Sequence, residues 1–115
     1  MQDFRNLRVW EKSHELNLRI ADLVDGYPRK ELFVLTFQMR KSASSIPTNI
    51  AEGCGQGTDA GFARYLQIAM GSACELEYQL IFSRDRKYVT NEVHARLESQ
   101  LLEVKRMLAG LLNKL

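Results

Sequence analysis

The sequence predicts an all-α fold, an antiparallel up-down-up-down bundle of four helices. Apolar residues recur at three- and four-residue steps in four long segments, which is the period of an amphipathic helix. No segment alternates apolar and polar residues as a half-buried strand does. The stretches between the segments are short, which favours antiparallel neighbours in a bundle.

The composition predicts a single domain over residues 1–115. Hydrophobic residues make up 45% of the chain and charged residues 26%, which is typical of a globular protein with one core. The two cysteines have no ligand spacing, and the chain shows neither a secretory leader nor the ~20-residue apolar run of a membrane span. We therefore expect a cytoplasmic protein. Its net charge of +2 permits a nucleic-acid partner without requiring one.

The first helix is expected over about residues 6–26. At 100° per residue, one side carries its core residues, Val9, Leu16, Ile20, Val24 and Tyr27. Gly26 followed by Pro28 ends the helix. Nearly opposite the core side lie Leu7, His14 and Leu18, a second strip that predicts contact with a protein partner.

The second helix is expected over about residues 29–53. Its apolar stripe consists of Leu32, Leu35, Met39, Ala43, Ile46 and Ile50. The stripe runs through Pro47, and a proline costs ~3 kcal/mol in an ordinary helix interior, so we predict a helix that is kinked there. Phe33 and Phe37 lie on a different side, so this helix too has a second apolar face.

Three glycines follow this helix, at positions 53, 55 and 57. They are predicted to supply positive φ angles and reverse the chain. The segment resembles a phosphate-binding loop, but it follows a helix instead of a strand and lacks the lysine of a P-loop. A turn is therefore the favoured interpretation.

The third helix is expected over about residues 58–87, with Thr58 or Asp59 as its N-cap. Its core stripe consists of Phe62, Leu66, Ala69, Ala73, Leu76 and Leu80. Well away from that stripe lie Cys74, Tyr78, Ile81 and Phe82. Glu75 is expected in a partly buried polar network, with Asn49, Ser72 or Gln79 as its partner.

The fourth helix is expected from about residue 90 to the C-terminus, capped by Thr90 or Asn91. Apolar residues alternate steps of four and three in a heptad seam of Leu97, Leu101, Val104, Leu108, Leu111 and Leu115. The other faces are mostly polar, so this helix is predicted to pack on the bundle from outside.

Catalytic or metal chemistry has little support. His14 and His94 lack a matching carboxylate or cysteine motif, which favours solvent or interface positions for both. Glu52, Glu75 and Glu77 are the candidate acids of a carboxylate metal site, but bundles of that kind use inward-facing Glu-x-x-His pairs, which the sequence lacks. We predict no enzyme, no cofactor and no metal.

Six basic residues are candidates for phosphate contacts: Arg5, Arg8, Lys12, Arg19, Arg40 and Lys41. The first four project within about 60° of one another on the first helix. Acidic residues border this stripe and can pair with it. In a symmetric oligomer each basic patch is repeated, and counterion release grows with the number of phosphates neutralised.

Three stretches carry a family resemblance. They are Phe4-x-x-Leu-x-Val-Trp10-x-Lys, Gln38-x-Arg-Lys-Ser-Ala-Ser-Ser-Ile-Pro-Thr-Asn-Ile-Ala-Glu-Gly53 and Phe62-x-x-Tyr-Leu-x-Ile-Ala-x-Gly-Ser-x-x-Glu-Leu-Glu77. Together they resemble the bacterial four-helix-bundle family encoded in intervening sequences of large-subunit ribosomal RNA genes. The resemblance covers nearly the whole chain, and the Ser-Ile-Pro-x-Asn-Ile-Ala-Glu-Gly element is specific.

The resemblance implies an assembly. The family is similar in fold to the accessory variability proteins of diversity-generating retroelements, which form homopentamers, bind nucleic acid and contact a reverse transcriptase. A homopentamer would explain second apolar faces, and we predict an oligomer interface containing Leu7, His14, Leu18, Phe33, Phe37, Tyr78 and Phe82. The basic candidates come from helical placement and are not taken from the family.

The sequence thus favours a non-enzymatic oligomeric scaffold associated with RNA or nucleoprotein, which binds nucleic acid weakly through phosphate contacts. The alternative is a purely protein-binding scaffold, for a reverse transcriptase or another partner, without nucleic-acid affinity.

Overall fold

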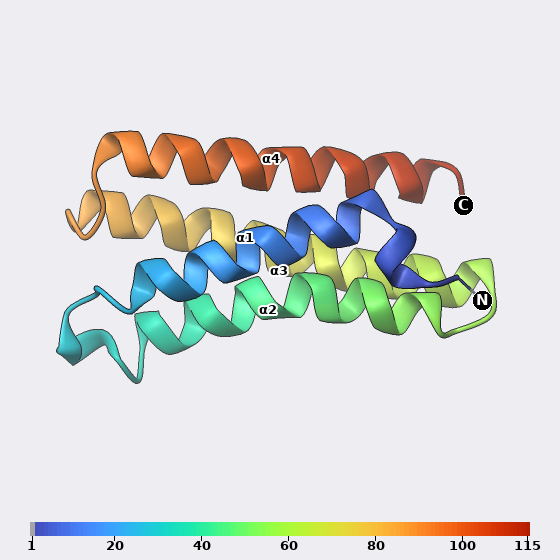
Figure 1. The fold of residues 1–115 in the computed structure, drawn as a ribbon, viewed down its shortest axis with the longest axis horizontal. Coiled ribbons are helices and arrows are strands. Elements are labelled where there is room, and N and C mark those ends of the chain that lie inside the picture. Colours follow the sequence, from blue (N-terminus) through green and yellow to red (C-terminus); the bar gives the residue numbers. More distant parts are fainter. Residues whose placement is uncertain (1) are drawn as a thin grey trace.

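Helices account for all the regular structure of the computed structural model, which describes residues 2–115 (Figure 1). In that part of the chain there are no strands, so the predicted all-α class is confirmed. The long helices are α1 (Arg8–Val24), α2 (Leu35–Cys54), α3 (Asp59–Asp85) and α4 (Asn91–Asn113). Two 3-10 turns, Phe4–Asn6 and Arg29–Glu31, precede α1 and α2.

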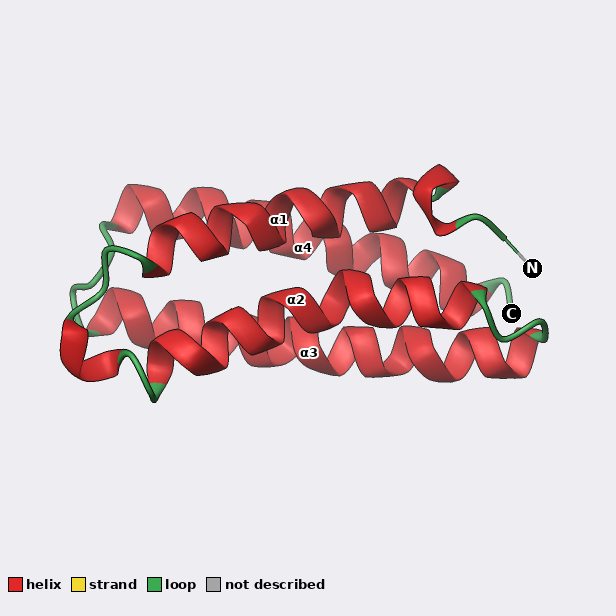
Figure 2. Ribbon diagram, turned by 60° about the horizontal axis from the view of Figure 1, so that its bottom comes forward, coloured by secondary structure: helices red, strands yellow, loops and turns green. Residues whose placement is uncertain are grey.

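The helices lie side by side along the long axis of a body of 43 × 25 × 19 Å. Each helix packs against the next in sequence, and α1 also packs against α4, which closes a four-helix bundle. The N- and C-termini lie at the same end (Figure 1), as an up-down-up-down path requires. Figure 2 shows α2 and α3 as one pair, with α1 and α4 as the other.

One core joins the inner stripes of all four helices. The predicted core residues of α1 and α3 are all buried, as are most of those of α2 and α4. Full burial of one leucine or isoleucine side chain contributes about 1.5–3 kcal/mol, so these stripes are the main source of stability.

Threonine side chains cap two of the helices, as predicted. The Thr58 hydroxyl oxygen accepts a hydrogen bond from the Gly61 backbone N–H at 3.0 Å, at the start of α3. The Thr90 hydroxyl oxygen accepts one from the Val93 N–H at 3.1 Å, at the start of α4. Each satisfies a backbone donor that has no partner within its helix.

The start of α2 differs from the prediction. The expected helix from about residue 29 is interrupted at Val34, whose backbone (φ −122°, ψ −94°) is not helical, so α2 begins at Leu35. Leu32 was predicted in the buried stripe, and this was wrong, because the helical spacing does not extend back through the interruption. Its side chain is 47% exposed.

The turn after α2 corrects the prediction for two glycines. Gly57 has the expected positive φ of 77°, but Gly55 has φ −84°, and Gly53 belongs to α2 itself. Gly53 serves a different purpose. A Cβ there would lie 3.0 Å from side-chain atoms of both Phe62 and Tyr65, so the glycine lets α3 approach α2 closely.

Two positions on α4 also differ from expectation. His94 was predicted in solvent or at an interface, but it is buried, because it continues the apolar seam three residues before Leu97. Leu115 lies beyond the end of α4 and is exposed, although it was predicted in that seam. Pro47 is buried inside α2, where its effect on the helix axis stays a prediction.

Candidate interaction surfaces

An exposed apolar surface lies where the N-terminal part of α2 meets the C-terminal half of α3. Its most exposed rings are Phe33, at 87% of full exposure, Tyr78 at 65% and Phe37 at 58%. We call this surface the aromatic face and define it by Leu32, Phe33, Val34, Phe37, Tyr78 and Phe82, all exposed. An apolar cluster of this kind is typical of a protein-interaction site, unlike single exposed leucines.

A groove of about 350 Å³ runs between α2 and α3 within the aromatic face; its walls include Val34, Tyr78 and Phe82. A neighbouring hollow continues it toward the middle of the helices, because Val34, Gln38 and Glu75 line both. We call the first of these the α2–α3 groove. It gives the aromatic face a concave floor, with apolar walls on both sides.

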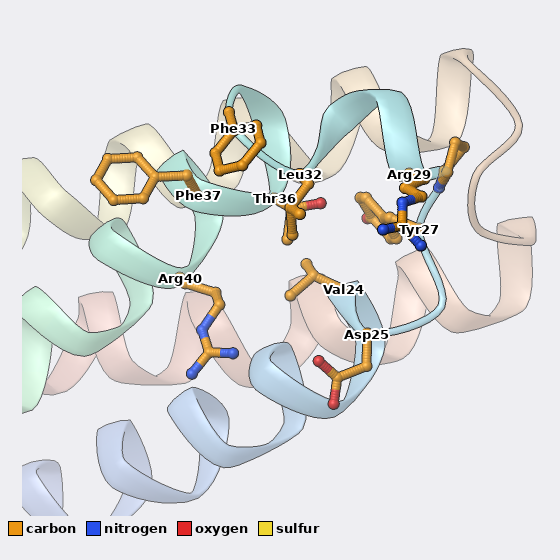
Figure 3. Close-up of a pocket in the computed structure, with 10 residues that line it drawn as sticks. Val24, Asp25, Tyr27, Arg29, Leu32, Phe33, Thr36, Phe37 and Arg40 are labelled. Atoms are coloured by element: carbon orange, nitrogen blue, oxygen red, sulfur yellow. The ribbon is translucent and has the colours of Figure 1, made fainter.

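A second hollow, of about 670 Å³, lies on the other side of α2, against the end of α1 (Figure 3). Arg40 extends from α2 toward α1, and Asp25 lies across the opening. Phe33 and Phe37 line this hollow as well as the one between α2 and α3. The chain around the start of α2 is therefore a ridge that carries Phe33 and Phe37, with a depression on either side.

The polar groups beneath the aromatic face correct one prediction. Ser45 joins α2 to α3, because its hydroxyl accepts from the Ser72 hydroxyl at 2.8 Å and from the Asn49 amide at 2.9 Å. Glu75 was expected in this network and lines the same hollow as Ser45 and Ser72, but it is exposed and forms no hydrogen bond or ion pair with a described residue, because Ser45 already pairs with Asn49 and with Ser72. Its carboxylate remains free at the groove.

Two further acceptors line the same groove. Gln79 is buried, and its Oε1 has no hydrogen-bond partner in the described part of the protein. Glu31 accepts a hydrogen bond from the Tyr88 hydroxyl through Oε2 at 2.7 Å. A buried acceptor without a donor costs roughly 1–3 kcal/mol. The Tyr27 hydroxyl and His94 Nε2 are also buried without a hydrogen-bond partner among the described residues, but of the three only Gln79 lines this groove.

The predicted strip on α1 is less exposed than the aromatic face. Leu7 is half-buried against the core, because it precedes α1 with an extended backbone (φ −88°, ψ 124°) and does not follow the helical projection. His14 stacks on Trp10 with ring centroids 5.1 Å apart. Only Leu18, 54% exposed, is freely available, so this strip offers a partner much less apolar surface.

The six basic candidates do not form one patch. Arg5 lies in the 3-10 turn before α1, where its guanidinium donates two hydrogen bonds to Asp3 and its backbone N–H donates a third, and this pairing lowers the pKa of the Asp3 carboxyl. Lys12 lies 3.7 Å from Glu103 Oε1 on α4. Two of the four basic residues that were predicted to form a stripe on the first helix are therefore paired with nearby carboxylates.

The remaining candidates are exposed and form no ion pair with a described residue. Arg8 and Arg19 lie on α1, and Arg19 shares a shallow groove with Arg96 of α4. Arg40 and Lys41 lie on α2 beside the aromatic face. The basic charge thus divides between an α1–α4 surface and the edges of the aromatic face.

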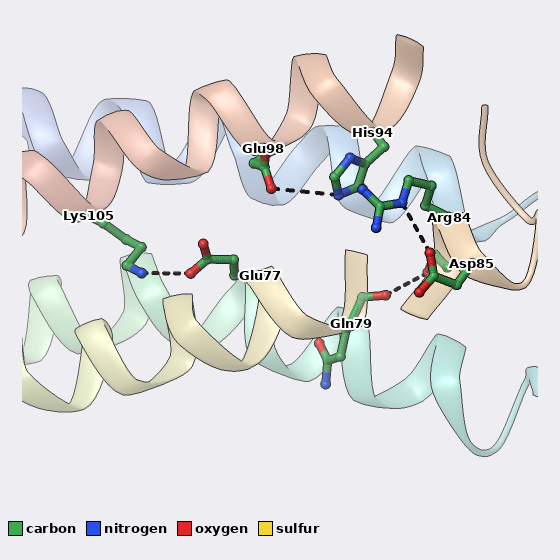
Figure 4. A network of polar contacts seen from close by, with 8 residues as sticks. Glu77, Gln79, Arg84, Asp85, His94, Glu98 and Lys105 are labelled. Atoms are coloured by element: carbon green, nitrogen blue, oxygen red, sulfur yellow. Dashed lines mark hydrogen bonds and ion pairs between the residues drawn. The ribbon is translucent and has the colours of Figure 1, made fainter. Parts of the chain in front are cut away.

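Carboxylates and histidines are dispersed over the helices. Within residues 2–115 no three His, Cys, Asp or Glu side chains are grouped closely enough to hold a metal ion. Glu77 instead accepts a 2.6 Å hydrogen bond from Lys105 across α3 and α4, which raises the pKa of Lys105 (Figure 4). His94 lies 3.8 Å from Glu98 in the same helix.

Helix length and the placement of the cysteines complete the description of the helices. Across the described residues, each helix is too short or too polar to cross a lipid bilayer. Cys54 is buried, which raises the pKa of its thiol, and Cys74 is exposed, so the two do not form a disulfide.

Sequence reasoning found four members of the aromatic face and missed Leu32 and Val34. Both belong to the run Leu32-Phe-Val-Leu35, and a run of four apolar residues cannot be buried entirely on one face of a helix. That run was the available signal. The sequence could not predict that Gln79 lacks a hydrogen-bond partner, because this depends on which groups of α2 lie near its side chain.

The fold and the exposed surfaces of residues 2–115 define a small four-helix-bundle protein with an exposed apolar face. Comparison with known families is more specific: residues 5–110 match the family described as 23S rRNA-intervening sequence protein. The chain therefore belongs to that family.

A solved structure shares the fold. It is the crystal structure, at 1.70 Å resolution, of a protein of unknown function from the S23 ribosomal protein family of Bacteroides thetaiotaomicron. The two proteins are 29% identical, with a TM-score of 0.85, over 91% of this chain and 95% of the other. Among curated proteins none shows significant similarity to this chain.

Proposed function

We propose that this protein is a non-enzymatic scaffold that assembles with itself through the aromatic face and associates with RNA or nucleoprotein. The observation that carries the proposal is the exposure of Phe33, Phe37 and Tyr78 on one surface. Aromatic side chains are enriched at protein interfaces, where their burial supplies much of the binding free energy. A homopentamer, expected from the family resemblance, would cover this surface in every copy.

Sedimentation velocity over a range of protein concentrations tests the assembly. Phe37→Glu places a charge at the centre of the aromatic face and is expected to shift the wild-type oligomer toward monomer. Ser99→Glu adds the same charge at an exposed site on α4 and should leave the oligomer intact. A wild-type monomer at every concentration, or an unchanged mass for Phe37→Glu, would remove the basis of the proposal.

The RNA association is supported by Arg8 and Arg19, which are exposed and have no ion-pair partner among the described residues. Phosphate contacts make binding weaken as salt rises. The logarithm of the binding constant falls with the logarithm of the salt concentration, with a slope of roughly −0.7 to −0.9 per phosphate neutralised. Binding of labelled structured RNA and duplex DNA should therefore be measured at several salt concentrations.

Neutralising both residues (Arg8→Ala with Arg19→Ala) is expected to reduce the salt slope, whereas Arg5→Ala should change it little because Asp3 already pairs with Arg5. The alternative function, a scaffold for proteins only, predicts no binding even at low salt. That outcome would leave the assembly proposal intact and direct the search to a protein partner.

A further inference from the structure

We infer that the α2–α3 groove binds the guanidinium group of Arg40 from a second copy of this chain. This inference rests on the proposed self-assembly and names the polar contact that would join the copies.

The groove provides acceptors that lack a donor. The charged residues that line it are Glu31 and Glu75, and it has no basic residue in its lining. Glu31 already accepts from Tyr88, whereas Glu75 is exposed and forms no ion pair with a described residue. Gln79 adds the Oε1 without a partner. The chemistry missing from this site is a cation that carries several hydrogen-bond donors.

The shape of the groove favours arginine over lysine. Tyr78 and Phe82 form its α3 wall and present aromatic rings to whatever enters. A guanidinium is planar, so it can stack on an aromatic ring while its N–H groups reach a carboxylate and an amide oxygen. A lysine ammonium is more strongly hydrated and cannot bridge two acceptors with the same fixed geometry.

Arg40 is an exposed arginine beside the aromatic rings, from where it can enter the groove of another copy. It is exposed beside Phe33 and Phe37 and has no ion-pair partner in the described structure, although Asp25 lies across the same hollow (Figure 3). It lies on the α1 side of α2, and the groove lies on the α3 side. The aromatic face therefore has Arg40 at its α1-side edge and Glu31 and Glu75 in the groove at its α3-side edge, with Lys41 farther along the hollow that continues the groove.

Opposite charges at the two edges make the face complementary to itself in a head-to-tail orientation. The Arg40 edge of one copy meets the groove edge of the next, which is a heterologous contact that can close into a ring. In a two-fold symmetric contact, by comparison, each copy uses the same patch. The inferred contact removes Arg40 from the candidate RNA-binding residues and places it between protomers.

A charge exchange tests the contact by sedimentation velocity at low salt. Arg40→Glu and Glu75→Arg are each expected to raise the dissociation constant of the assembly at least tenfold, because each places like charges together. The double variant should recover most of the wild-type affinity. The matched controls are Arg106→Glu on α4 and Glu15→Arg on α1, both exposed residues, which should assemble as the wild type does.

Normal assembly of either single variant, or a double variant no better than the singles, would overturn the inference. Circular dichroism of each variant shows whether the helices are intact. Phe37→Glu separates this inference from the proposed function. If Phe37→Glu dissociates the oligomer while Arg40→Glu does not, self-assembly stands and the arginine contact is wrong. If Phe37→Glu assembles normally, the aromatic face itself is not the interface.

Discussion

Helix α4 and the α2–α3 pair differ in how much of their apolar surface is buried in the core. α4 buries one seam of His94, Leu97, Leu101, Val104 and Leu108 and exposes mostly polar side chains. α2 and α3 bury complete stripes of their own and still expose the aromatic face. Because one core uses only one face of each helix, apolar residues left over on a second face indicate a second contact.

The difference also concerns where unpaired polar groups lie. The α3–α4 contact includes the Glu77–Lys105 hydrogen bond, so both its charges are paired. The α2–α3 groove has a free carboxylate at Glu75 and a buried acceptor at Gln79. His94 on α4 also has a buried nitrogen without a hydrogen-bond partner among the described residues, so the distinguishing feature of the α2–α3 region is that its surplus apolar surface lies beside an unpaired carboxylate, Glu75.

The largest expected effect contrasts the two faces of α3. Leu76→Ala removes a fully buried side chain and should lower the free energy of unfolding by about 2–5 kcal/mol. Tyr78 is two residues away but exposed. Tyr78→Ala should therefore change the free energy of unfolding of the dissociated protomer by only about 0.5 kcal/mol or less. Urea denaturation at low protein concentration measures both. Equal losses would show that Tyr78 belongs to the core of the protomer.

A smaller effect is expected at the paired α3–α4 contact. Glu77→Gln should lower the free energy of unfolding by about 1 kcal/mol at neutral pH, because Lys105 loses a partly buried charged partner. Glu15→Gln, at an exposed site on α1, is the matched control and should change stability little.

The pH dependence of the same variant follows from Lys105. Its pKa is raised above the ordinary value of 10.5 by the hydrogen bond to Glu77, so folding favours the protonated amine. The stabilisation is complete below pH 10.5 and is lost as pH rises through the higher folded-state value. The stability difference between wild type and Glu77→Gln should therefore shrink in strongly alkaline solution. A difference that stays constant there would mean that the contact does not depend on the lysine charge.

The smallest effect is expected on α1. Leu18→Glu should weaken assembly far less than Phe37→Glu does, because the other two residues of its predicted strip, Leu7 and His14, are already partly covered within the protomer. Sedimentation velocity of the two variants under identical conditions gives the ratio of the dissociation constants of their assemblies. A comparable loss would make the α1 strip an equal part of the interface, whereas full retention of the oligomer would place Leu18 on its free surface.

The sequence by itself determined the four helices and their buried stripes. Helical periodicity is local, so burial of the α1 and α3 stripes and the caps at Thr58 and Thr90 could be predicted from spacing and residue type. The same reasoning failed where the chain departs from helical geometry, at Leu32 before α2 and at Leu7 before α1. There, angular projection no longer describes where a side chain lies.

Only the tertiary structure decided which surface residues lie together. Phe33 and Tyr78 are far apart in sequence, and the packing of α2 on α3 brings them to one face. Helix packing likewise placed Lys12 beside Glu103, left Glu75 free and buried Gln79 without a partner. Hydrogen bonds and ion pairs between helices depend on interhelical distances of a few ångströms, which the spacing of residues along one helix does not specify.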